Sequence, residues 1–100
     1  MKLILTTTLL MVMWQCNPTP APAARVATQL QWDQSTTPRV TYRVYRSQSH
    51  GGPYQLVTQI PGTMYVDNTV RRHNVYYYVV RAWDGTLESV NSNELMLSVP

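Results

Sequence analysis

The residues of this chain that could do catalytic or metal chemistry are few and lie far apart. His50 and His73 stand in separate predicted turns, and the single cysteine, Cys16, can form neither an intrachain disulfide nor a thiolate metal cage. The five carboxylates are dispersed. Three of them stand at predicted turns, where aspartate caps backbone amides: Asp33, Asp67 and Asp84. The sequence therefore predicts a protein that is not an enzyme, with no catalytic, metal-binding or cofactor-binding residues and no cofactor.

Binding chemistry is concentrated in two segments where tyrosine, tryptophan and arginine alternate with other residues. Side chains of an extended segment point to opposite faces in turn, so one side of residues 75–83 and one side of residues 40–46 carry these groups. Flat aromatic rings beside arginine suit sugar rings or a protein partner. The alternative is that tyrosine and valine are simply good strand formers there, covered by arginine stems. We call this set the predicted binding face: Arg43, Tyr45, Tyr77, Val79, Arg81 and Trp83.

Size and charge limit the partners that the chain can have. Its 100 residues form one domain at most, and 8 Lys and Arg against 5 Asp and Glu give a formal charge of +3. The arginines are scattered, so no nucleic-acid partner is predicted. The densest cluster, Arg71–His73, is interpreted as a solvated loop.

The first 16 residues have the composition of a signal peptide. Met1 and Lys2 give a short positive start, and Leu3 to Trp14 is apolar apart from three threonines. Such a segment is too short to span a bilayer but suits the apolar core of an export signal. Residues 17–25 are rich in Pro, Ala and Thr and are predicted to form an extended linker.

Cys16 leaves the export route open. A cysteine directly after an apolar core resembles the lipid-modified cysteine of bacterial lipoproteins, although Met13, Trp14 and Gln15 depart from the small residues usual before it. The alternatives are cleavage after Ala23 with simple secretion, or a retained N-terminal anchor. In each case the protein is expected outside the cytoplasm, in the periplasm, anchored at the envelope or secreted. Contact with a membrane is expected only through that lipid or an uncleaved signal.

Residues 26–100 read as a series of short strands separated by turns. Alternation and β-branched or aromatic composition mark the strands, and Gly51-Gly52-Pro53, Pro61-Gly62 and Asp84-Gly85 mark turns. Turns about every ten residues without helical periodicity predict an all-β antiparallel sandwich. The expected strands are Val26–Trp32, Val40–Arg46, Tyr54–Ile60, Met64–Val66, Val75–Trp83 and Glu94–Val99.

The order and spacing of several motifs resemble a fibronectin type III domain of the kind found in bacterial exported proteins. The resemblance implies an immunoglobulin-like β-sandwich that covers residues 26–100. It also implies that residues 40–46 pair with residues 75–83, which would unite the predicted binding face. The matching motifs are Leu30-Gln31-Trp32, Tyr42 to Ser47, Gly51 to Tyr54, Thr63 to Asp67 with Val70, Tyr76 to Ala82, and Ser92-Asn93-Glu94.

The same resemblance implies a tyrosine corner at Val70 and Tyr76, in which the phenol bonds back to the upstream backbone. The family usually has Pro and Gly inside this corner, where the chain has Arg72 and His73. A left-handed backbone is therefore expected at His73. The expected core is Trp32, Tyr42, Val44, Tyr65, Tyr76, Tyr78, Val80, Leu95 and Leu97.

The first family strand is expected to be missing or irregular, since only the proline-rich stretch precedes Val26. Either Pro20 to Ala24 forms a crude edge strand, or the strand that starts at Val26 keeps an open edge. The predicted function is a non-catalytic exported module for binding or spacing, with a protein or polysaccharide partner at the cell envelope. The alternative is a lipid-anchored structural protein that assembles through that open edge.

Overall fold

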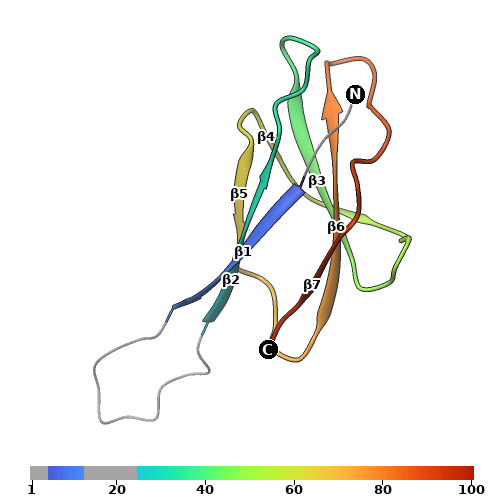
Figure 1. Cartoon of the computed structure of the whole chain (residues 1–100). Coiled ribbons are helices and arrows are strands. Elements are labelled where there is room, and N and C mark those ends of the chain that lie inside the picture. Colours follow the sequence, from blue (N-terminus) through green and yellow to red (C-terminus); the bar gives the residue numbers. More distant parts are fainter. Residues whose placement is uncertain (1–4, 13–24) are drawn as a thin grey trace.

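The computed structural model describes residues 5–12 and 25–100, which form two antiparallel sheets packed face to face (Figure 1). The strands are β1 (Leu5–Val12), β2 (Arg25–Trp32), β3 (Thr41–Ser47), β4 (Gln55–Ile60), β5 (Met64–Asp67), β6 (Val75–Trp83) and β7 (Leu95–Ser98). One sheet has the order β1-β2-β5 and the other the order β4-β3-β6-β7. The predicted all-β sandwich is therefore confirmed.

The position of the first strand differs from what the sequence predicted. Leu5–Val12, inside the predicted signal peptide, pairs with β2 along its whole length, from Leu5 opposite Trp32 to Val12 opposite Arg25. The edge of β2 that was expected to be open is therefore covered. The prediction missed β1 because its residues do not alternate, so their pattern indicates an apolar leader rather than a half-buried strand. Pro20 to Ala24, the alternative first strand, lie outside the described residues, as does Cys16.

The second sheet owes its stability to β6, whose nine residues are mostly tyrosine and valine. β6 pairs with β3 over seven residues and with β7 over four. Beyond β7, Ser89 and Ser92 continue along β6, since their hydroxyls accept hydrogen bonds from the backbone N–H groups of Ala82 and Val80 at 2.9 and 2.8 Å. β6 is thus held on both sides for most of its length, which fixes the direction of its side chains.

The core lies between the sheets and agrees with the sequence prediction. Seven of the predicted residues are buried, and the partly buried Tyr65 and Leu95 pack against them. The rings of Trp32 and Tyr42 contact each other at 5.7 Å between centroids. The buried seven are Trp32, Tyr42, Val44, Tyr76, Tyr78, Val80 and Leu97.

The tyrosine corner forms as expected. The hydroxyl of Tyr76 accepts a hydrogen bond from the backbone N–H of Arg71 at 2.9 Å, next to the buried Val70. His73 has a φ of 66°, the left-handed backbone that the family usually assigns to glycine. The N–H of His73 donates to the carbonyl of Val99 at 3.0 Å, so the corner is also tied to the end of β7.

Candidate binding face

Pairing of β3 with β6 brings four predicted residues together on the outer surface of the second sheet. Arg43 lies opposite Arg81, and Tyr45 and Trp83 flank this pair because they lie opposite Val79 and Thr41. All four side chains are partly exposed. Two arginines are directly opposed here, and like charges at such positions repel unless a carboxylate lies between them.

Glu88 supplies that carboxylate. Its Oε2 atom lies 2.9 Å from Nη1 of Arg43, and its Oε1 atom lies 2.6 Å from Nη1 of Arg81. The hydroxyl of Tyr45 donates to the same Oε2 atom at 2.7 Å. Partial burial opposes ionisation, but hydrogen bonds from the two arginines and Tyr45 lower the pKa of Glu88 to about 2. One carboxylate therefore joins β3, β6 and the connection after β6.

Each arginine also lies over an aromatic ring. The guanidinium of Arg43 lies 4.0 Å from the centroid of a Trp83 ring, and that of Arg81 lies 4.5 Å from the ring of Tyr45. These distances fit cation–π contacts. One face of each ring is therefore partly covered by an arginine, as the alternative interpretation of the sequence held.

Two predicted residues are placed differently from the other four. Val79 lies on the outward-pointing side of β6, but its relative exposure is 0%, so the prediction that it contacts a partner is wrong. Tyr45 lies directly opposite Val79 on β3. Tyr77 stays partly exposed and lies beside the ring of His50, 5.8 Å away between centroids.

A second carboxylate, Glu94, fixes the turn between β3 and β4 beside Tyr77. It accepts hydrogen bonds from the backbone N–H of Gly51 at 2.8 Å and from the hydroxyl of Tyr54, and it pairs with the imidazole of His50. Burial and the bond to Glu94 raise the pKa of Tyr54 to about 12. Gly51 and Gly52 have φ values of 79° and 92°, which explains the glycines in this turn.

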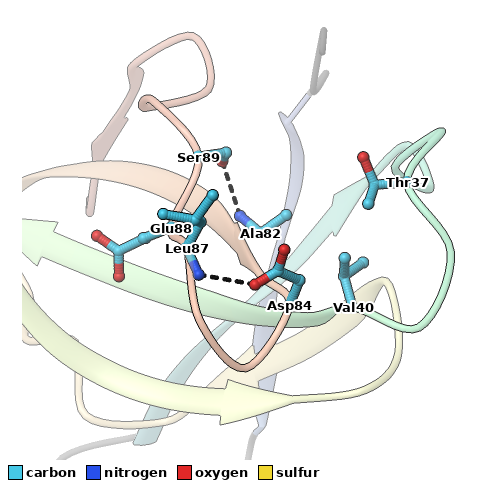
Figure 2. Close-up of a pocket in the computed structure, with 7 residues that line it drawn as sticks. All are labelled: Thr37, Val40, Ala82, Asp84, Leu87, Glu88 and Ser89. Atoms are coloured by element: carbon cyan, nitrogen blue, oxygen red, sulfur yellow. Dashed lines mark hydrogen bonds between the residues drawn. The ribbon is translucent and has the colours of Figure 1, made fainter.

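A small pocket lies at the end of β6 (Figure 2). It has a volume of about 170 Å³, and Figure 2 shows the carboxylate of Glu88 turned away from its other lining residues. Oδ1 of Asp84 accepts hydrogen bonds from the N–H groups of Thr86 and Leu87 at 2.8 and 2.7 Å, so Asp84 caps this turn as predicted. The pocket is lined by Thr37, Val40, Ala82, Asp84, Leu87, Glu88 and Ser89.

Asp67 carries more than the turn-capping role that the sequence predicted. It is 0% exposed, and its Oδ2 atom accepts hydrogen bonds from Arg46 at 2.8 Å and from the hydroxyl of Tyr78 at 2.7 Å. Oδ1 accepts from the N–H and hydroxyl of Thr69 at 3.0 and 2.6 Å. Burial alone would raise the pKa of Asp67, but hydrogen bonds from Thr69 and Tyr78 and the charge of Arg46 hold it below its ordinary value.

Four of the five side-chain carboxylates thus form hydrogen bonds or ion pairs within the fold: Asp67, Asp84, Glu88 and Glu94. Across the described ranges, no three residues of the metal-ligating types His, Cys, Asp and Glu are grouped so that they could hold an ion. The same ranges contain no helix that could span a lipid bilayer. The outer surface of the second sheet carries partly exposed aromatic rings and arginines side by side.

Comparison with solved structures decides the family. An Fn3-like protein from Clostridium thermocellum superposes with a TM-score of 0.66 at 37% sequence identity, over 74% of this chain and 77% of that one. The chain belongs to the fibronectin type III family. This fibronectin type III fold is a common non-catalytic module. Comparison with models of protein families finds no match, and comparison with curated proteins finds none either.

More distant structures share the fold. A human fibronectin type III domain, derived from the KIAA0970 protein, gives a TM-score of 0.63 at 20% identity, over 75% of this chain and 64% of that one. Pectate lyase PelI from Erwinia chrysanthemi, in complex with tetragalacturonic acid, gives 0.61 at 17% identity, over 90% of this chain and 27% of the enzyme. At these identities the likeness concerns the fold alone.

Proposed function

We propose that this fibronectin type III chain is an exported, non-catalytic module that binds a protein or polysaccharide partner at the cell envelope. The binding surface is the outer side of the second sheet, with Arg43, Tyr45, Tyr77, Arg81 and Trp83. The observation that carries the proposal is the Glu88 carboxylate, which holds Arg43, Arg81 and Tyr45 in one arrangement. Side chains that are ordered before binding lose less conformational entropy when a partner arrives.

The chemistry of this surface supports both partner classes. Trp83 and Tyr77 are partly exposed and give flat apolar area, and Arg43 and Arg81 are partly exposed as well. Aromatic residues and arginine are the side chains that most often dominate binding energy. Arg43 and Arg81 are the long, flexible side chains of this surface, and both are already paired with Glu88, which lowers the entropy cost of ordering them when a partner binds.

The test begins with a capture experiment that uses the protein to retain envelope proteins and cell-wall polysaccharide. With a captured partner in hand, Tyr77→Ala with Trp83→Ala should weaken binding by more than about 2 kcal/mol while the domain stays folded. The matched control is Met64→Ala with Val66→Ala on β5, since those side chains are 52% and 43% exposed on the other sheet. Unchanged affinity of the first double variant would show that the outer side of the second sheet is ordinary surface.

A second candidate function is assembly through the edge of β2. The pairing of β1 with β2 shows that this edge accepts an antiparallel strand over eight residues. If export removes residues 1–15 or 1–23, that edge loses its partner strand and becomes available to another chain. The test is the mass of a chain that begins at Cys16. Sedimentation as a monomer at high concentration would count against assembly, and a dimer that the full chain does not form would support it.

A further inference from the structure

The two ends of the sandwich differ in charge. One end, which we call the basic end, holds the start of β2, the β5–β6 connection and the end of β7. The register places these together, because Thr28 pairs with Asp67 near the start of β2, and Val75 pairs with Ser98. In Figure 1 this end carries the C-terminus and the entry into β2.

The basic end carries two arginines that form no ion pair with a described side-chain carboxylate. Arg71 and Arg72 are exposed, and none of the ion pairs between described residues includes either one. His73 is exposed beside them, and Arg25 begins β2 at the same end. The acidic residue nearest in sequence, Asp67, is fully buried and already paired with Arg46.

The sequence before β2 adds no negative charge, since the first carboxylate of the chain is Asp33. Among the described residues, the opposite end of the sandwich exposes Asp33 and Asp84 against one arginine, Arg39. At the basic end, the exposed arginines of the described residues that lack an ion-pair partner are Arg71 and Arg72.

The basic end is also where the predicted tether meets the fold. Residues 17–25 lead from Cys16 directly into β2 at Arg25. We propose that the basic end, through Arg71 and Arg72, binds the anionic headgroups of the membrane to which the N-terminal segment brings the chain. This inference rests on the proposed export of the protein. It adds a contact between the basic end and the membrane to the contact made by the N-terminal segment.

Each arginine near an anionic surface contributes about 1 kcal/mol, so two of them give weak binding on their own. For a chain already held at the membrane, the effective concentration of headgroups is high, and weak contacts suffice to orient it. The basic end would then face the lipid. The surface with Tyr45, Tyr77 and Trp83 would stand to the side, and the end with Asp33 and Asp84 would point away.

The test uses the full chain and cosedimentation with two kinds of vesicle: phosphatidylcholine alone, and phosphatidylcholine with phosphatidylglycerol. The ratio of the two binding constants isolates the charge contribution, because the apolar N-terminal segment contributes to both. We expect a preference for the anionic vesicles at low salt that disappears when salt screens the charges. Arg71→Gln with Arg72→Gln should reduce that preference by roughly 30-fold.

The matched control is Arg39→Gln, the same change at an exposed arginine of the opposite end, and it should leave the preference unchanged. Equal preference in all three proteins would overturn the proposal. Tighter binding of double-stranded DNA than of anionic vesicles would also overturn it, because the basic end would then be a nucleic-acid surface. The Tyr77→Ala, Trp83→Ala variant should keep the vesicle preference, so failure of the partner-binding face is distinguishable from failure of this inference.

Discussion

Tyr76 closes the corner between β5 and β6 with one hydrogen bond from the N–H of Arg71 to its hydroxyl. Tyr76→Phe removes the acceptor and leaves that N–H unpaired in a partly buried position. We expect the free energy of unfolding to fall by about 1 kcal/mol, measured by urea denaturation. Tyr77→Phe is the control, because no described residue bonds to that hydroxyl, and it should change stability by less than about 0.5 kcal/mol. Equal losses in both variants would show that the corner bond contributes nothing specific.

Asp67 is the buried charge on which three other side chains depend. Asp67→Asn keeps the shape but leaves Arg46 without its counter-charge, and breaking a buried pair in this way costs about 3 kcal/mol. Asp33→Asn, at an exposed position, should be close to neutral. Thermal unfolding of the two variants side by side provides the measurement. A small loss for Asp67→Asn would mean that water replaces the missing charge.

The lowered pKa of Glu88 makes the stability of the folded domain depend on pH in the acidic range. Its folded-state pKa of about 2 lies below the ordinary value of 4.5, so the unfolded chain binds the proton more readily. The stabilisation is complete above pH 4.5 and is lost as the pH falls towards 2. Asp67, whose pKa is also lowered, acts in the same direction. Glu88→Gln should therefore show a flatter fall in melting temperature across this range than the unchanged protein, and parallel curves would contradict the role of Glu88.

At the scale of elements, β1 is the strand whose removal has the clearest consequence. It pairs with β2 in the structure, yet it lies within the segment that export is predicted to remove. In a chain that begins at Cys16, amides of β2 that face β1 should exchange hydrogen faster, while those of β3 and β6 keep their protection. The full chain is the reference. Loss of protection throughout the molecule would show that β1 is required for folding and would argue against cleavage.

The other strands could be predicted because each has a local pattern. The ends of β6 at Val75 and Trp83 match the sequence prediction, whereas β3 differs from it by one residue at each end and β4 by one residue at its start. Alternation also separated Tyr42 and Tyr78, which are buried, from Tyr45 and Tyr77, which are not. Alternation gave the outward direction of the Val79 side chain but not its burial, because burial also depends on the size of the neighbouring side chains. Glu88 was not predictable, since it lies 45 residues from Arg43 in a segment without periodicity.

At the scale of the whole molecule, the same N-terminal residues have two roles that exclude each other: a strand of the fold and part of an export signal. Leu5–Val12 can complete the first sheet, whereas an export signal has to leave the fold before cleavage. Mass spectrometry of the protein from cells decides between the outcomes. A diacylglycerol-modified Cys16 at the terminus would establish the lipoprotein route, and a terminus at Ala24 would establish simple secretion. Both place the domain outside the cytoplasm without β1. A full-length chain in the cytosol would contradict export, and β1 would then be a permanent strand of the sandwich.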